Sequence, residues 1–192
     1  KAIANGFPVS VVAGRRDIMQ EFEEVFFSAT YGGETLSLAA IVATIQKLKR
    51  ENVHDHIWRI GAYLKKGVEN LIVKHGVADH VAIAGHPVKT AFNFVGTPDA
   101  TALEMKTYFQ QECARRGVLF IGYHLPSLAH KKVDIDVTLG VYDEVLSSFK
   151  DVMRNGKLRE SLTGSVLEQI FKNVGDRSAG LAAKPYRPVW RV

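Results

Sequence analysis

Short apolar and β-branched runs alternate with longer segments of helical periodicity along most of this 192-residue chain. Residues 9–13 and 25–28 have the composition of strands, and residues 17–23 have the pattern of a short helix. Two longer segments, from about Glu34 to Arg50 and from about Asn52 to His75, place apolar residues three or four positions apart. This alternation predicts an α/β architecture, because each amphipathic helix must bury its apolar face against another element.

The two long segments carry apolar stripes that predict buried helix faces. The first stripe comprises Leu38, Ile41, Val42, Ile45 and Leu48. The second stripe comprises Ile57, Ile60, Leu64, Val68, Leu71 and Ile72. Gly76 follows the second segment, so we expect it to be the C-cap of that helix.

The residues after Gly76 predict a unit of strand, strand, helix, strand and helix. We expect strands at Val81–Ala84, Thr90–Val95 and Val118–Ile121, with a turn at residues 85–87 between the first two. A unit of this composition is an α/β or α+β fold in its own right.

Two helix starts in this unit are predicted from their capping residues. Thr97 followed by Pro98 predicts the start of a helix that ends at Gly117. Asp134 is expected to cap the next helix. The buried face of that helix is expected to comprise Ile135, Leu139, Tyr142, Leu146, Phe149 and Met153.

Composition excludes several classes of protein. Hydrophobic residues make up 46% of the chain and charged residues 23%, which is ordinary globular composition and not that of a disordered or collagen-like chain. The single cysteine, Cys113, excludes a disulfide framework and a cysteine-based zinc site within this chain, and it suits a reducing compartment. We expect no bound metal.

Charge and hydropathy argue against nucleic-acid and membrane partners. The chain has 25 Lys and Arg against 20 Asp and Glu, a net charge of +5, but acidic residues lie between the basic pairs. A nucleic-acid surface usually clusters its positive charge. No apolar run approaches the ~18 residues that cross a bilayer, and no signal peptide opens the sequence. We therefore expect a cytoplasmic protein.

Three stretches contain residues able to carry chemistry, and each has a structural alternative. Lys1 precedes a Gly-Pro turn and is either an amine nucleophile or a solvated lysine. Residues 27–34 place hydroxyls and glycines before a helix, an arrangement that can hold a phosphate or simply cap the helix. His124 and His130 flank Pro126 in a connection where either could touch a ligand or be structural.

Other motifs are absent or unsuitable. His54 and His56 are two residues apart and face different sides of a helix, so we interpret them as surface residues. The sequence contains no GxSxG, Walker A, GxGxxG or HExxH motif.

Two of these stretches together resemble a known family. Residues 1–19, KAIANGFPVSVVAGRRDIM, look like the segment that carries the cofactor lysine in class III aminotransferases, and are most similar to the glutamate-1-semialdehyde aminomutase-like branch. Residues 26–40, FFSATYGGETLSLAA, resemble the threonine segment of that family and follow at the expected distance. The strands from Val81 to Val95 and the stretches 115–120 and 127–139 resemble its C-terminal small domain, so the correspondence extends to about Met153.

The resemblance implies a cofactor and a set of site residues. It makes Lys1 the lysine that forms a Schiff base with pyridoxal phosphate and acts as the catalytic proton shuttle. It makes Thr30 the residue that binds the cofactor phosphate, usually from the other subunit of a homodimer, with a backbone amide of Ala29 as a further contact. The implied substrates are a small-molecule amine donor and a carbonyl acceptor.

Departures from the aminomutase pattern favour a plain transaminase. The turn after Lys1 is less glycine-rich than in mutases. The connection from Phe120 to His130 is shorter, and it contains no acidic residue where a mutase-specific carboxylate is expected. Glu34 stands where the mutase-like motif has a small amide residue, and it either touches the substrate or caps the helix. His124 is a second candidate substrate contact.

The family chain is roughly twice this length, so we expect this chain to be the C-terminal half of a fold type I PLP-dependent transferase. Residues 1–75 would be the end of the large cofactor-binding domain, residues 76–156 the small α/β domain, and residues 157–192 a C-terminal helix and a surface-wrapping tail. Three functions stay open: a transaminase, a glutamate-1-semialdehyde-type aminomutase, and a non-catalytic binding domain derived from the family.

Overall fold

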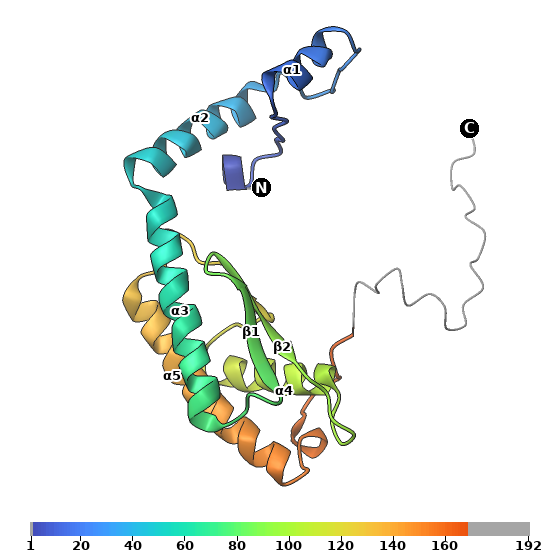
Figure 1. The fold of residues 1–192 in the computed structure, drawn as a ribbon, viewed down its shortest axis with the longest axis vertical. Coiled ribbons are helices and arrows are strands. Elements are labelled where there is room, and N and C mark those ends of the chain that lie inside the picture. The colour runs from blue at the N-terminus through green and yellow to red at the C-terminus, as the bar shows by residue number, and fades with distance from the viewer. Residues whose placement is uncertain (1, 169–192) are drawn as a thin grey trace, which may run out of the picture. The chain divides into compact units, whose positions relative to one another are not determined.

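The computed structural model describes residues 2–168 (Figure 1). Lys1 and most of the expected C-terminal helix and tail therefore lie outside the described residues. In chain order the helices and strands are η1 Ala2–Ala4, α1 Arg16–Met19, η2 Gln20–Glu23, α2 Thr35–Arg50, α3 Val53–His75, β1 Val81–His86, β2 Lys89–Phe94, α4 Ala102–Arg115, β3 Tyr123–His124, α5 Lys132–Arg154 and η3 Arg159–Ser161.

The chain divides into two compact units. The first takes in the residues up to 67 together with 85–90 and 124–137. The second takes in residues 68–84, 91–123 and, within the described chain, 138–168. The helices α3 and α5 and the hairpin of β1 and β2 each contribute residues to both units. The domain boundaries expected from the sequence stay a prediction.

The N-terminal part of the first unit confirms the expected helices but not the expected strands. Residues 9–15 and 26–29 form no strand, and Val11 and Val12 are more than half exposed. The prediction of a buried strand at Val9–Ala13 and of a possible strand or extended segment at Val25–Ser28 is therefore wrong as regards a strand. A strand exists only where a neighbour accepts and donates its backbone hydrogen bonds, and no described segment pairs with either run.

The helix α2 begins where the sequence predicts but buries little of its apolar stripe. Leu38 and Val42 are exposed, and Ser37 is the buried residue of the helix. The described segment that packs on α2 is η1, which contributes the buried Ala4. The other residues of the stripe, Ile41, Ile45 and Leu48, are half-buried, so the stripe is only partly covered.

Close contacts join the remaining elements of the first unit. The phenol of Tyr63 on α3 donates to Asp136 of α5 at 2.6 Å. The ammonium of Lys65 donates to the carbonyl of Gly85 at 2.9 Å. Gly61 lies against the turn after β1, where an added Cβ would overlap the carbonyl oxygen of Pro87. The long helix α3 therefore approaches this turn closely because it has a glycine there.

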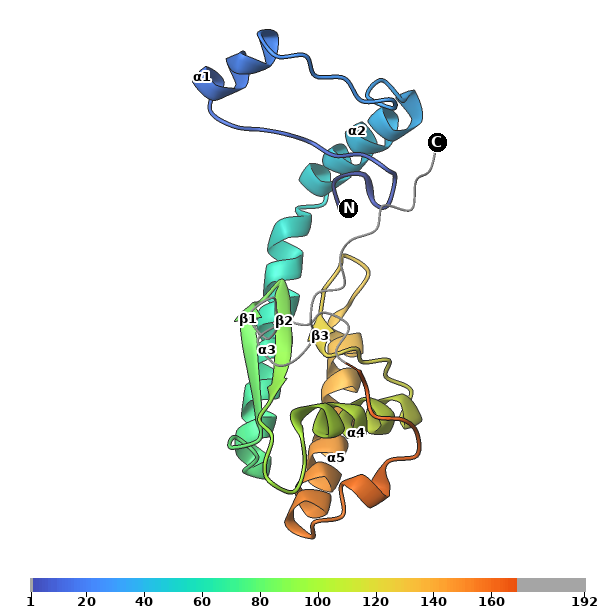
Figure 2. The same ribbon diagram turned by 90° about the vertical axis from the view of Figure 1, so that its right-hand side faces the viewer.

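The second unit holds the main apolar core. The three-stranded sheet has the order β1-β2-β3, with β1 and β2 side by side in Figure 2. Rings of Phe92, Phe109, Phe120 and Tyr142 meet with centroids 5.0–5.7 Å apart. Each of these rings is at most 6% exposed, so they form the centre of the unit.

The hairpin confirms the first two expected strands, whereas the third differs. Residues 118–121 form no strand, and β3 is the two-residue segment Tyr123–His124. The amide of Phe92 donates to the carbonyl of Gly122 at 3.0 Å, just before β3. The ring of Phe120 is buried in the core although residues 118–121 pair with no strand. Burial of this ring accounts for an apolar residue in a run that is not a strand.

Two helix starts differ from the predicted positions. Helix α4 begins after Thr101, whose hydroxyl accepts from the amide of Glu104 while the Glu104 carboxylate accepts from the amide of Thr101. This capping box satisfies two amides at once and outcompetes the expected start at Thr97. Helix α5 begins at Lys132, and Asp134 lies within its first turn, where it accepts from the amide of Lys131 at 2.8 Å.

The expected helix ends and the apolar faces of the second unit agree with the structure. Gly76 and Gly117 follow α3 and α4 with φ of +66° and +82°, the left-handed conformation typical of a C-cap. On the expected apolar face of α5, Tyr142, Leu146 and Phe149 are fully buried. After α5, the described part of residues 157–192 contains only the short turn η3. Within residues 2–168, no helix combines the length and the apolar character needed to span a bilayer.

Candidate functional site

Thr30 lies in the first of two overlapping turns that lead into α2. The carbonyl of Ala29 accepts from the amide of Gly32 at 3.0 Å, and the carbonyl of Tyr31 accepts from the amide of Glu34 at 3.1 Å. Thr30 is a central residue of the first turn and is exposed. An added Cβ at Gly32 would make a tight contact of 3.2 Å with the Ala29 carbonyl oxygen. The turn therefore presents a hydroxyl on a short, hydrogen-bonded frame.

The carboxylate of Glu34 occupies the N-terminus of α2. Its two oxygens accept from the amides of Leu36 and Ser37, each at 2.7 Å. The adjacent Ser37 hydroxyl and the amides of Ser37 and Leu36 hold the pKa of Glu34 below its usual range. The structure therefore shows Glu34 as the N-cap of the helix. Its possible contact with substrate stays a prediction.

His124 is an uncharged residue at neutral pH. Burial lowers its pKa to about 4, because the charged imidazolium loses its solvation there. Its Nδ1 lies 2.9 Å from the hydroxyl oxygen of Thr90, which is buried on β2. A neutral imidazole in this position can exchange hydrogen bonds with a ligand but cannot attract an anion by charge.

A cavity of about 630 Å³ lies between α2, the start of α3 and the loop before α5 in the first unit. Its lining comprises Ala2, Asn5, Thr44, Lys47, Leu48, Val53, Ile57, Pro126, Ser127, Leu128 and Ala129. The cavity thus brings Ala2, which follows Lys1, together with residues 126–129. These residues belong to the connection from Phe120 to His130, which contains no acidic residue. Lys47 is the charged residue of this lining, and it also pairs with Glu51 at 3.0 Å.

Sequence reasoning missed this cavity, because its walls come from three separate segments. Asn5 has a φ of +49° in the turn after η1, a conformation that asparagine tolerates better than most residues. The loop wall is held by His130, whose Nδ1 accepts from the amide of Ser127 at 3.0 Å. None of Thr30, Glu34 and His124 lines the cavity.

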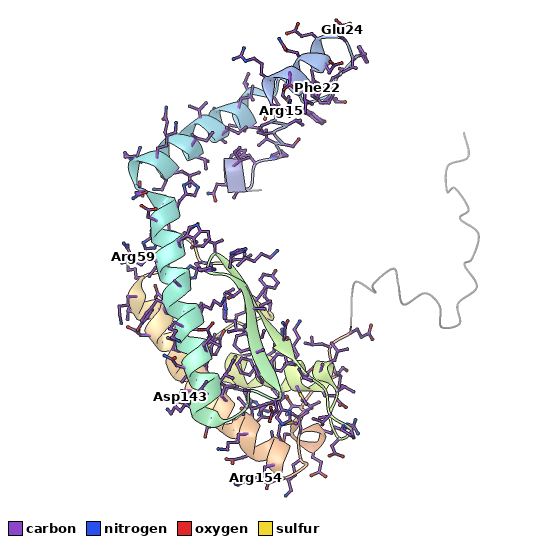
Figure 3. All side chains as sticks on the ribbon, in the orientation of Figure 1. Arg15, Phe22, Glu24, Arg59, Asp143 and Arg154 are labelled. Atoms are coloured by element: carbon purple, nitrogen blue, oxygen red, sulfur yellow. The ribbon has the colours of Figure 1, made fainter. Side chains whose placement is uncertain are left out.

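Other histidines and carboxylates among the described residues form structural contacts and do not gather into a second candidate site. Asp143 on α5 lies beside the last turn of α3, where it accepts from Lys74 at 2.6 Å and lies 2.6 Å from Nε2 of His75 (Figure 3). His56 contacts the carbonyl of His130 at 3.0 Å. Across residues 2–168, no three histidine, cysteine or carboxylate side chains gather as a metal site.

Comparison with known proteins decides the family. The profile described as Aminotransferase class-III matches residues 1–153, most of the chain. This chain belongs to the class III aminotransferase family. The glutamate-1-semialdehyde 2,1-aminomutase of Thermomicrobium roseum is 29% identical over 151 residues, which cover 72% of this chain and 35% of that protein.

Solved structures agree on the fold. The FumI protein of Sphingopyxis sp. MTA144, solved in its PLP internal aldimine form, matches 84% of this chain and 37% of its own, with a TM-score of 0.68 and 23% identity. A transaminase with PLP bound matches 80% of this chain and 38% of its own, with a TM-score of 0.70 and 18% identity. The fold is thus part of a fold type I PLP-dependent transferase, and the chain spans about a third of these relatives.

Family membership, together with solved relatives that hold PLP, supports pyridoxal phosphate as the cofactor. The described residues fit its phosphate in one place and not in another. The exposed Thr30 hydroxyl and the amides of its turn are neutral donors of the kind that bind phosphate. The N-terminus of α2 is unsuitable, because the Glu34 carboxylate already takes two of its amides.

Proposed function

We propose that this chain is part of a PLP-dependent transaminase, which moves an amino group from a small-molecule amine donor to a carbonyl acceptor. The observation that carries the proposal is the membership of residues 1–153 in the class III aminotransferase family, with the lysine and threonine segments at the spacing of that family. Pyridoxal phosphate, when bound, supplies the electron sink that such an amine transfer needs.

Three residues are proposed to serve the cofactor. Lys1 binds it covalently through the side-chain amine and, once released, moves a proton on the substrate carbon as a general base and acid. Thr30 donates its hydroxyl to the phosphate, and a backbone amide of Ala29 is a further donor. We also propose a homodimer, in which this threonine serves the site of the partner subunit.

An intramolecular aminomutase is the second candidate. The observation that favours it is the name of the curated relatives, which are glutamate-1-semialdehyde 2,1-aminomutases. Against it stands the segment from Phe120 to His130, which contains no acidic residue. The cavity lined by this loop has a lysine as its charged residue and no carboxylate, so an acidic group for the mutase reaction has no source among the described lining residues.

The first test is an absorbance spectrum of the full-length protein before and after borohydride reduction, with mass spectrometry of the peptide that begins at Lys1. We expect a visible band that reduction removes, and a cofactor-sized adduct on Lys1. The absence of band and adduct with added pyridoxal phosphate would contradict the proposal and leave a non-catalytic domain.

A second measurement separates the two reactions. A transaminase needs a separate amine donor for turnover, whereas an aminomutase turns over a single substrate without one. We expect turnover only when donor and acceptor are both present. If glutamate-1-semialdehyde is converted fully without a separate amine donor, the proposed function is the aminomutase and not the transaminase.

A further inference from the structure

We propose that Glu34 is a positioning residue, which holds Thr30 in place by capping α2, and that it is not a ligand of the substrate. The inference rests on the proposed role of Thr30 in binding the cofactor phosphate. It goes beyond that role by assigning the acidic residue that stands four positions later.

The first step of the argument is the capping geometry. Each oxygen of the carboxylate accepts one hydrogen bond at 2.7 Å, one from the amide of Leu36 and the other from the amide of Ser37. The Glu34 backbone has the extended conformation of an N-cap, with φ of −66° and ψ of 112°. A side chain folded back onto its own helix in this way points its charge at the amides and not outward to a substrate.

The second step is the continuity between the cap and the threonine turn. The Glu34 amide donates to the carbonyl of Tyr31 at 3.1 Å, and the Gly32 amide donates to the carbonyl of Ala29 at 3.0 Å. The Glu34 amide closes the second turn, which shares Tyr31 and Gly32 with the turn that contains Thr30, and the Glu34 carboxylate caps the helix. Loss of the carboxylate frees the first turn of α2 and, through the shared residues, the frame that holds Thr30.

The third step is the anchoring of the helix start. Ser37 is only 3% exposed, and α2 packs on η1, whose Ala4 is 1% exposed. Ser37, whose amide donates to the Glu34 carboxylate, is thus one of the few buried residues of the segment before α3. Leu36 and Leu38 on either side are exposed, so packing alone does not hold this end of α2.

The fourth step is electrostatic. The lowered pKa of Glu34 means that the cap is ionised at neutral pH, when its charge also complements the positive end of the helix dipole. An ionised carboxylate at this place excludes a phosphate from the two amides that it occupies. The phosphate is thereby left to the hydroxyl and the amides of the threonine turn.

The experiment compares Glu34→Ala with Glu34→Asn in the full-length protein, with Glu24→Ala as the control. Asparagine is a good N-cap but carries no charge, so it restores a cap and does not restore an anionic ligand. Glu24 is an exposed acid outside α2, so its loss removes the same charge without touching a helix start. The readouts are amide hydrogen exchange of residues 35–40, the dissociation constant of pyridoxal phosphate, and the KM for the amine donor.

We expect Glu34→Ala to speed exchange at Leu36 and Ser37 and to weaken cofactor binding about fivefold. Glu34→Asn should restore both properties, with the KM for the donor unchanged, and Glu24→Ala should alter neither. The inference is overturned if Glu34→Asn raises the donor KM as Glu34→Ala does, or if Glu34→Ala leaves exchange unchanged. If the wild-type protein binds no cofactor, the proposed function is wrong and so is the positioning role that rests on it. The exchange measurement tests separately whether Glu34 stabilises the first turn of α2.

Discussion

The hydroxyl oxygen of Thr90 lies 2.9 Å from Nδ1 of His124, and Thr90 is 1% exposed. The pair joins two strands of the sheet, β2 and β3, at a site where burial lowers the pKa of the imidazole to about 4. A histidine of this kind is neutral in the cell. If it contacts a substrate, it does so as a hydrogen-bonding group and not as a counter-ion.

This burial predicts an acid sensitivity that depends on His124. The folded-state pKa lies below the unfolded value of about 6.5, so the unfolded chain takes up the proton first. Stability is therefore complete above about pH 6.5 and falls as the pH drops toward 4, by about 3 kcal/mol for this group. Urea unfolding of wild type and of His124→Gln at pH 7.5 and pH 4.5 should show the smaller loss in the variant.

His54→Gln is the control for that measurement, because it also removes one imidazole but at an exposed position on α3. It should keep the pH dependence of the wild type. An identical pH dependence in His124→Gln and wild type would show that His124 is solvated in the folded protein.

Gly61 and Gly140 are both helical glycines, yet alanine should affect them in opposite directions. A Cβ at Gly61 would overlap the carbonyl oxygen of Pro87, whereas a Cβ at Gly140 meets nothing within 4 Å. We expect Gly61→Ala to destabilise the protein by about 2 kcal/mol. Gly140→Ala should stabilise it by roughly 0.5–1 kcal/mol through helix propensity.

Thermal or urea denaturation of both variants checks this pair. A stabilised Gly61→Ala variant would mean that the turn at Pro87 lies farther from α3 than the structure shows. The comparison cancels the intrinsic preference of helices for alanine, so the difference between the variants measures the close approach alone.

Glu112 is the buried carboxylate of α4, and it pairs with two arginines. Burial raises its pKa, but hydrogen bonds and charge from Arg116, Gln111 and Arg115 outweigh burial and leave the pKa lowered. Its oxygens lie 2.6 Å from Arg115 and 2.7 Å from Arg116. Glu112→Ala should cost about 2 kcal/mol of unfolding free energy, because two arginines lose a shared buried partner.

Glu144 offers a matched control, since it also pairs with Arg116, at 3.0 Å, but its side chain is 69% exposed. Glu144→Ala should cost less than about 1 kcal/mol in the same urea titration. Equal losses for the two variants would contradict the greater importance of the buried carboxylate.

The proposed phosphate role of Thr30 predicts a hydroxyl-dependent loss. Thr30→Ala should raise the dissociation constant of pyridoxal phosphate by about tenfold or more, as one hydrogen bond to a charged group is removed. Thr30→Ser keeps the hydroxyl and should bind nearly as tightly as wild type. The type of reaction should not change in either variant. Spectroscopic titration of the apo protein measures this, and equal affinities in all three proteins would remove Thr30 from the site.

The helices were predictable because their determinants are local. Apolar spacing was enough to place α2, α3, α4 and α5, but two starts were wrong. The cap of α4 was expected at Thr97 and is Thr101, and α5 begins before the expected cap Asp134. Both threonines cap amides, but only Thr101 has a glutamate three residues on that returns the hydrogen bond.

Strands were less predictable because a strand is defined by its neighbours. Residues 9–13 and 118–121 are more apolar than β2, yet neither run forms a strand, whereas β2 has strand partners on both sides among the described residues. The candidate site follows the same division. The turn and helix start at Thr30 and Glu34 were visible in the sequence, whereas the choice of a capping role for Glu34 depended on the direction of its carboxylate.

The amino-acid sequence by itself determined the positions of the long helices, since these depend on residue types at short, fixed spacings. Its resemblance to class III aminotransferases indicated the family and the cofactor. Tertiary structure alone decided the neutral state of His124, the close approach at Gly61 and the cavity beside Ala2. These features arise from segments far apart in the chain, and burial and distance between such segments are set by packing, which local sequence does not encode.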